Sequence, residues 1–195
     1  MPDILTYRQE VYRKLIHISS SFIGIMLWYM GKNTIIPYII IIAIIFIIFD
    51  YSRKHIHFLK NIYESTFGFV TREHEYQTFS GATWVFLGTG ISICIFNEKI
   101  ALISILVMSL SDSAAALIGI KYGNTKLFNK SLEGTVSFFI ITYAIIFSFL
   151  SASAHFVLIA SLCITLIELF STHHINDNIL IPIATGVILS FGGIY

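Results

Sequence analysis

Residues 36–49 read IPYIIIIAIIFIIF and contain no charged side chain. A helix over 34–50 approaches the length of about 20 apolar residues that the hydrocarbon core of a bilayer requires. Of the 195 residues in the chain, 56% are hydrophobic and 12% are charged, and the mean hydropathy is +0.81. A soluble domain of this size has too little interior to bury so much apolar surface. We therefore expect an all-α integral membrane protein, with residues 1–195 forming a single transmembrane domain.

Further apolar stretches before and after this run predict a polytopic protein with about seven transmembrane helices. The predicted spans are 15–30, 34–50, 80–97, 99–120, 135–153, 155–171 and 179–195. Between the second and third spans, residues 53–79 mix charges with apolar residues such as Ile56, Leu59 and Phe67. This amphipathic pattern favours an interfacial segment that lies along the inner membrane surface.

The distribution of basic residues predicts the orientation of the chain. With the N-terminus in the cytoplasm, ten of the twelve Lys and Arg residues fall on the inner side. Only Lys32 and Lys99 fall outside, and such a bias favours this orientation. Nearly every Asp and Glu also falls at the inner ends of spans or in inner loops. We expect the polar chemistry to face the cytoplasm. The net charge of +1 excludes a strongly basic nucleic-acid binder.

Residues 111–135, SDSAAALIGIKYGNTKLFNKSLEGT, place a carboxylate near the end of an apolar run. On a helix, Asp112, Ala116, Gly119 and Gly123 share one narrow face, because they are spaced by four, three and four residues. Helix packing alone explains the small residues, since small-xxx-small patterns bring transmembrane helices together. It does not explain Asp112, because a carboxylate near the bilayer needs a partner and usually has a function.

The loop that follows suggests a site for a polyphosphate. Lys121, Lys126 and Lys130 surround glycine-rich backbone, and ammonium and amide groups together bind phosphates. Asp112 and Glu133 flank the loop and could hold the Mg²⁺ that accompanies a nucleotide. A loop whose lysines only fix the topology is the alternative. The loop is not a Walker A motif, because G-x-x-x-x-G-K-[ST] does not occur.

The same stretch resembles a family signature, D-x-x-A-x-x-x-G-x-x-x-G…K…K-x-x-E-G, of membrane lipid kinases. The family includes dolichol kinase, phytol kinase and the CTP-dependent diacylglycerol kinases, and the related phosphatidate cytidylyltransferases share part of the signature. The stretch EVYRKLIHI at 10–18 resembles the opening of the kinase branch, and ELFSTHHINDNILIP at 168–182 resembles an element of phytol kinase-like proteins. The C-terminal elements typical of the cytidylyltransferases are missing.

Several of these residues have plainer interpretations as well. Arg13 and Lys14 could be interfacial anchors, and His17 could be a hydrogen-bonded core residue. Residues 72–75 could face the site or form a solvated charge cluster. The pair Asp177 and Asn178 could simply initiate the last helix.

The resemblance implies a magnesium-dependent kinase that transfers the terminal phosphoryl group of a nucleoside triphosphate, CTP, to the hydroxyl of a lipid alcohol in the membrane. The acceptor would be phytol, a polyprenol or dolichol, or diacylglycerol. A phospholipid cytidylyltransferase, and a small transporter or non-catalytic membrane partner, are the alternatives. The residues expected to act in catalysis are Asp112, Glu133, Asp177, Glu168 and His17, of which Asp112, Glu133 and Asp177 would bind the metal. Those expected to bind the nucleotide are Lys121, Lys126, Lys130, Gly119, Gly123, Gly134 and Asn178.

Overall fold

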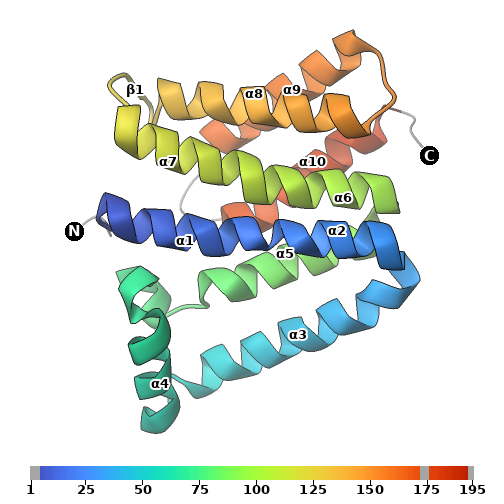
Figure 1. The fold of residues 1–195 in the computed structure, drawn as a ribbon. Coiled ribbons are helices and arrows are strands. Elements are labelled where there is room, and N and C mark those ends of the chain that lie inside the picture. Colours follow the sequence, from blue (N-terminus) through green and yellow to red (C-terminus); the bar gives the residue numbers. More distant parts are fainter. Residues whose placement is uncertain (1–4, 172–175, 193–195) are drawn as a thin grey trace.

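The computed structural model describes residues 5–171 and 176–192, and these form a bundle of long helices (Figure 1). In chain order the elements are α1 (Tyr7–Ser19), α2 (Ser21–Met30), α3 (Lys32–Ser52), α4 (His57–Phe67), the 3₁₀ turns η1 (Gly68–Val70) and η2 (Glu73–Tyr76), α5 (Gly81–Ile95), α6 (Glu98–Leu106), the π-helical turn η3 (Val107–Ser111), α7 (Asp112–Tyr122), β1 (Lys126–Leu127), β2 (Lys130–Ser131), α8 (Leu132–Phe149), α9 (Ala154–Leu169) and α10 (Asp177–Ser190).

Local sequence signals mark where several helices begin and end. Thr6 and Gln9 form a capping box that starts α1, which satisfies backbone donors that the helix cannot pair internally. Gly31 separates α2 from α3 with a φ of 77°, a conformation that glycine adopts without steric cost. Ser131 caps the start of α8, where its side chain accepts a hydrogen bond from the Gly134 amide.

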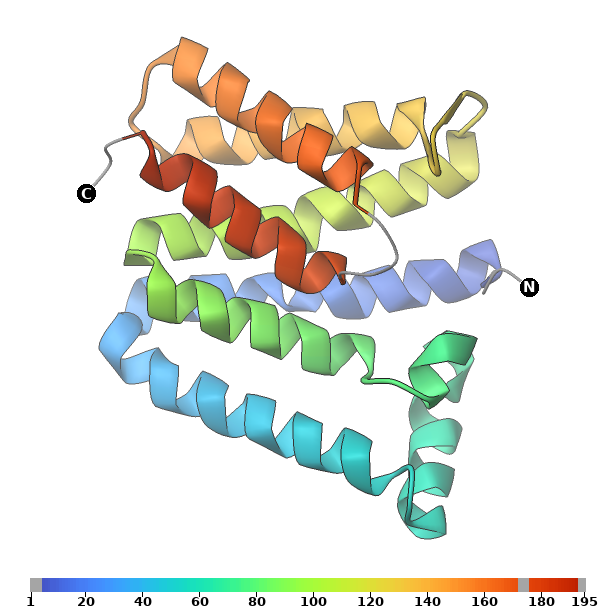
Figure 2. The same ribbon diagram turned by 180° about the vertical axis from the view of Figure 1, so that it is seen from behind.

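The rod made of α6, η3 and α7 lies at the centre of the bundle, between the α1–α2 rod and α8 (Figure 1). Ile103, Ile105, Val107 and Met108 of this rod are fully buried. Behind it, α10 packs between α9 and α5 (Figure 2). Helix α3 lies at the edge of the bundle and exposes many isoleucines, as expected for a helix that faces lipid rather than protein.

Each predicted span corresponds to a helical rod, although several boundaries differ. Within the described residues, three rods are long and apolar enough to cross a membrane, and they are Lys32–Ser52, Glu98–Tyr122 and Leu132–Phe149. Three shorter apolar helices, α5, α9 and α10, have 15, 16 and 14 residues. The last span, expected over 179–195, is a helix over Asp177–Ser190, and residues 193–195 lie outside the described residues. The count of seven spans therefore stays a prediction.

A small hairpin departs from the all-helical expectation. Strands β1 and β2 pair antiparallel, with Lys126 opposite Ser131 and Leu127 opposite Lys130. The turn between them places Phe128 at a φ of 55°. The hairpin gives the lysine loop a fixed shape, which a simple topology-determining loop would not need.

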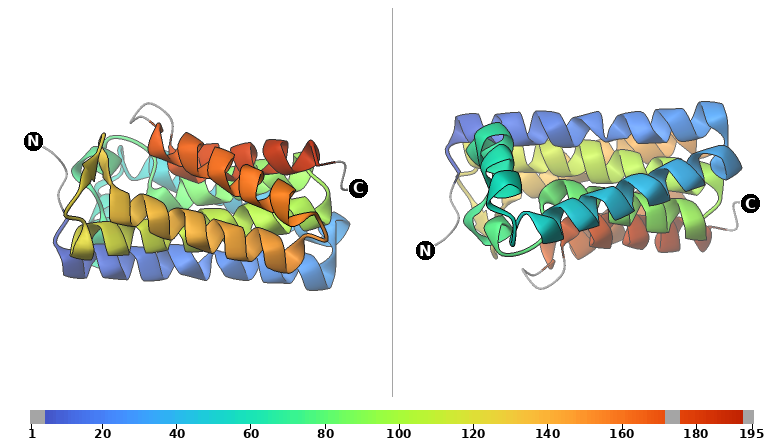
Figure 3. Two further views of the ribbon diagram at one scale, coloured as in Figure 1. Left: turned by 90° about the horizontal axis from the view of Figure 1, so that it is seen from above. Right: turned by 90° about the horizontal axis from the view of Figure 1, so that it is seen from below.

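The polar connections gather at one end of the bundle. The N-terminal end of α1, the hairpin and α4 lie at that end, whereas the α2–α3 turn and the C-terminal end of α10 lie at the other (Figures 1 and 3). Helix α4 runs crosswise beside the ends of α3 and α5 (Figures 1 and 2), and it exposes Phe58 and Phe67. This orientation agrees with the interfacial role expected for 53–79, which stays a prediction.

Candidate active site

Asp112 lies at the first residue of α7, directly after the π-helical turn η3. Lys14 of α1 donates to Asp112 Oδ2 at 2.5 Å, and His17 Nε2 lies 3.4 Å from the same oxygen. His17 Nε2 also lies 3.0 Å from the carbonyl oxygen of Met108, within the π-helical turn. Because a carbonyl can only accept, Nε2 carries a proton and donates to it. The sequence did not indicate a partner for Asp112, and in the structure the side chains of α1 hold its carboxylate.

Lys130 forms a second charged centre, at the end of the hairpin. Its Nζ lies 2.5 Å from Glu168 Oε1, 3.1 Å from Ser171 Oγ and 3.7 Å from Asp177 Oδ2. These partners come from the end of α9 and the start of α10, two elements that the sequence separates from Lys130 by about 40 residues. Asp112 and Asp177 line the same cavity, so the two charged centres open into one space.

The predicted glycines lie where α7 and α8 approach most closely. A Cβ on Gly119 would lie 2.9 Å from Ser131 Oγ, and one on Gly134 would lie 2.8 Å from the carbonyl oxygen of Ala115. Gly123 is also crowded by Ser131. The packing interpretation of these glycines therefore holds in the structure, while the same residues also line the cavity described below.

We expect Gly134→Ala to destabilise the protein by about 1–3 kcal/mol, because overpacking forces the backbone or neighbouring side chains to shift. Thermal unfolding of the purified protein in detergent measures this effect. Gly90→Ala in α5 is the matched control, since its Cβ would make an ordinary contact of 3.4 Å with Ile39. A Gly134→Ala protein as stable as the Gly90→Ala protein would show that the helix crossing tolerates a methyl group.

Most of the predicted site residues line one cavity of about 1030 Å³. Its volume lies at the upper end of small-molecule sites, about 300–1,000 Å³. The predicted residues that line it are His17, Asp112, Gly119, Gly123, Lys126, Lys130, Gly134, Glu168, Asp177 and Asn178. Their side chains come from α1, α7, the hairpin, α8, α9 and α10, so the fold brings distant motifs to one place.

Two predicted residues, Glu133 and Lys121, do not line this cavity. The Glu133 carboxylate accepts hydrogen bonds from the amides of Asn124 and Thr125, both at 3.1 Å, and so braces the loop before the hairpin. Lys121 is exposed, with its Nζ 5.0 Å from the ring centroid of Tyr122. The metal role of Glu133 and the nucleotide role of Lys121 remain predictions.

The donor set of the cavity fits Mg²⁺ bound together with phosphates. In the described part of the chain, no group of three or more His, Cys, Asp and Glu side chains could hold a metal on its own. Mg²⁺ is usually bound through one or two carboxylates plus substrate phosphate oxygens, and Asp112 and Asp177 provide two. In addition, Glu168 Oε2 is buried and has no hydrogen-bond partner among the described residues, which is costly unless a ligand or water supplies one.

Sequence reasoning missed the role of Lys14 and the pairing of Arg13. Their sequence positions are compatible with interfacial anchors, but Lys14 is buried against Asp112 and Arg13 forms a two-pronged ion pair with Glu75. Burial lowers the pKa of Arg13, but the hydrogen bond with Glu75 and the negative charge of Glu75 outweigh this effect. The pKa of Arg13 therefore lies above its ordinary value. Glu75 is thus buried rather than part of a solvated cluster.

A second buried network, which the sequence did not indicate, ties α4 to the bundle. Asp50 at the end of α3 accepts hydrogen bonds from the Ser80 amide at 2.7 Å and from the Ser80 and Thr83 hydroxyls. Arg53 donates to Asp50 at 2.6 Å, and its guanidinium lies 3.9 Å from the ring centroid of Tyr63 in α4. Burial raises the pKa of Tyr63 above its ordinary value. The network fixes the crosswise helix beside the cavity.

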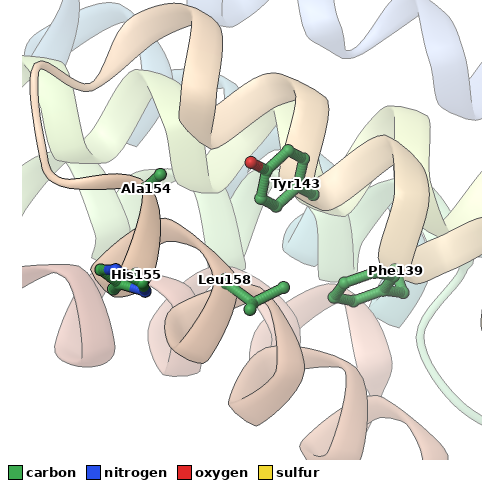
Figure 4. A pocket seen from close by; sticks show the side chains of 5 residues that line it. All are labelled: Phe139, Tyr143, Ala154, His155 and Leu158. Atoms are coloured by element: carbon green, nitrogen blue, oxygen red, sulfur yellow. The ribbon is translucent and has the colours of Figure 1, made fainter.

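A smaller hollow of about 260 Å³ lies between α8 and α9 and is lined by Phe139, Tyr143, Ala154, His155 and Leu158 (Figure 4). None of the predicted site residues lines it. The larger cavity is therefore the candidate active site.

Comparison with known proteins identifies relatives of stated function. A CTP-dependent diacylglycerol kinase of Saccharomyces cerevisiae is 37% identical over 143 residues, which are 70% of this chain and 49% of the yeast protein. The corresponding kinase of Eremothecium gossypii is 29% identical over 71% of this chain and 45% of its own. An uncharacterized protein of Rickettsia prowazekii is 29% identical over 90% of both chains.

The chain is similar to CTP-dependent diacylglycerol kinases, which confirms the resemblance to lipid kinases inferred from its motifs. It spans about half the length of the two fungal kinases named above. No family model matches the chain, and no solved structure matches it either.

Proposed function

We propose that the protein is an integral membrane kinase that transfers the terminal phosphoryl group of CTP to the hydroxyl of a lipid alcohol. The observation that carries the proposal is a single cavity in which a charged end, with Lys130 and Asp112, continues into an apolar region lined by Phe46 and Phe86. A water-soluble nucleotide suits the first part and a lipid the second. The family relationship to CTP-dependent diacylglycerol kinases supports the same reaction.

In this proposal Lys126 and Lys130 hold the phosphates of the nucleotide. Asp112 and Asp177 hold Mg²⁺, while Lys14 and His17 keep the Asp112 carboxylate in position. Bound Mg²⁺ would neutralise charge on the phosphate oxygens, which is a large part of catalysis in phosphoryl transfer.

Glu168 is the proposed acceptor of the hydroxyl proton, because its Oε2 is buried at the cavity and no residue in the described part of the chain forms a hydrogen bond with it. The alcohol oxygen forms a bond to the terminal phosphorus of CTP, the bond from that phosphorus to the bridging oxygen breaks, and CDP leaves with the electron pair. The proton of the alcohol passes to the carboxylate, as in general base catalysis.

A direct test uses the purified protein in detergent micelles with CTP and Mg²⁺. The acceptors are phytol, a polyprenol, dolichol and diacylglycerol, and phosphorylated lipid is the readout. We expect one acceptor class to be phosphorylated, with CTP preferred over ATP. Absence of a phosphorylated product with every acceptor, from protein that binds CTP, would contradict the kinase proposal.

We further propose that the end of the bundle with the hairpin faces the cytoplasm, because ten of the twelve basic residues belong to that end. In a background without Cys94 and Cys163, Asn124→Cys in intact cells should resist a membrane-impermeant maleimide. Ser151→Cys, in the α8–α9 connection at the opposite end (Figure 1), should react. The reverse labelling pattern would overturn this orientation.

A further inference from the structure

Part of the candidate active site is an apolar region, which we call the arm. None of the charged residues assigned to the proposed reaction belongs to it. Its lining includes Ile16 of α1, Phe22 and Ile23 of α2, Phe46 of α3, and Val85 and Phe86 of α5. The α1–α2 rod and α3 meet near Gly31 and diverge toward the charged end of the bundle (Figure 1). The α1–α2 rod and α3 both contribute residues to the lining of the arm.

The mouth of this arm lies where its lining residues are most exposed. Ile16 and Phe22 line the cavity, yet they are 51% and 61% exposed. Both belong to the first apolar rod, whose exposed faces meet lipid if the rod crosses the bilayer. The arm is thus open at membrane depth, which a site for water-soluble substrates alone would not require.

An aromatic pair forms one wall of the arm. Phe46 of α3 and Phe86 of α5 stack with their ring centroids 4.9 Å apart and their planes 22° apart. Both side chains are half-buried, and Phe49 lines the cavity about one turn along α3 from Phe46. Stacked rings present a rigid surface, because each has only two side-chain torsions and each supports the other.

We infer that the lipid acceptor enters sideways from the membrane between the α1–α2 rod and α3, and that Phe46 and Phe86 determine how bulky a chain the enzyme accepts. The inference rests on the proposed function and assigns it an entry path and two specificity-determining residues. The hydroxyl of the acceptor reaches Asp112 and Glu168, while the chain lies along the aromatic pair and leaves through the mouth.

Enlarging the arm should change acceptor preference without changing nucleotide binding. For Phe46→Ala and Phe86→Ala, we expect the ratio of kcat/KM for a two-chain diacylglycerol to that for single-chain phytol to rise about tenfold, the scale on which pocket size discriminates apolar groups. The KM for CTP should stay within about twofold, because neither ring belongs to the charged end.

Phe147→Ala is the matched control. Phe147 stacks on Tyr143 with planes 12° apart, but it is 58% exposed on α8 and does not line the cavity. An unchanged acceptor ratio in both Phe46→Ala and Phe86→Ala, or an equal change in Phe147→Ala, would overturn the assignment.

Photolabelling separates this inference from the kinase proposal, since it needs no turnover. A long-chain alcohol with a diazirine in its chain should label peptides that contain residues 16–23, 46–49 and 85–86, and Val85→Trp should reduce the labelling by filling the arm. Labelling there without phosphorylation of any lipid would support the entry path and refute the kinase. Labelling confined to other exposed helix faces would refute the entry path.

Discussion

The Asp112→Asn protein is expected to insert and fold normally and to lose more than about 100-fold in turnover, equivalent to about 2.7 kcal/mol in the barrier. Asn keeps the shape of the side chain and can still accept the hydrogen bond from Lys14, so the helix contact survives. It lacks the negative charge that Mg²⁺ requires of a ligand. Initial rates of lipid phosphorylation at several Mg²⁺ concentrations provide the measurement, and raising Mg²⁺ should restore little activity.

Glu64→Gln is the control for Asp112→Asn. Glu64 is an exposed carboxylate on α4 that pairs with Lys60 at 3.7 Å, so its neutralisation should leave the rate near that of the wild type. If the Asp112→Asn protein kept activity within a few-fold of the wild type, Asp112 would be a structural partner of Lys14 and not a metal ligand.

Replacing Lys130 with Ala should weaken CTP binding by about 1.5–3 kcal/mol, the range for hydrogen bonds to charged groups. The structure adds a second reason for a large effect. Lys130 neutralises Glu168, which is buried, and an unpaired buried carboxylate next to a phosphate site repels the nucleotide. Isothermal titration calorimetry of the purified protein with CTP measures the change in affinity.

Lys60→Ala supplies the comparison for Lys130→Ala, because Lys60 is an exposed lysine at the same end of the bundle and does not line the cavity. Its CTP affinity should match that of the wild type. Unchanged CTP affinity in a folded Lys130→Ala protein would assign Lys130 to the structural pairing of the hairpin with α9 and α10.

Much of the fold was predictable because the membrane limits what a chain can do. Backbone groups in lipid must be paired within a helix or barrel, so isoleucine-rich stretches such as 36–49 predict helices directly. The hairpin of β1 and β2 was not predictable, since two-residue strands leave no periodic pattern. The π-helical turn before Asp112 also lacks a sequence signal of its own.

The site was predictable where short motifs carry several polar residues, and unpredictable where pairing is long-range. The sequence indicated Asp112 and Lys130 from one continuous stretch. The partner of Asp112 is Lys14, 98 positions away, and only the packing of α1 against α7 selects Lys14 for it. The adjacent Arg13 faces Glu75 instead. Adjacent residues on a helix point about 100° apart, so two similar cations receive different partners.

Glu133 illustrates the limit of reading a motif without its local geometry. The sequence favours it as a metal ligand because it flanks the lysine loop. In the structure its carboxylate accepts two backbone amides of that loop, which fixes the approach to the hairpin. The role of Glu133 as a metal ligand stays a prediction, and the proposed metal ligands that line the cavity are Asp112 and Asp177.

The destination of the CTP phosphates tests the central claim most directly. The purified protein is incubated with a lipid alcohol or, in a parallel reaction, with the corresponding lipid phosphate. The CTP carries the label at either the γ- or the α-phosphate, and the lipid and the nucleotide products are separated. The kinase proposal predicts that label from γ-labelled CTP appears in the lipid, and that α-labelled CTP yields labelled CDP and unlabelled lipid. Transfer of the α-label to the lipid with release of pyrophosphate would instead identify a cytidylyltransferase and contradict the proposal.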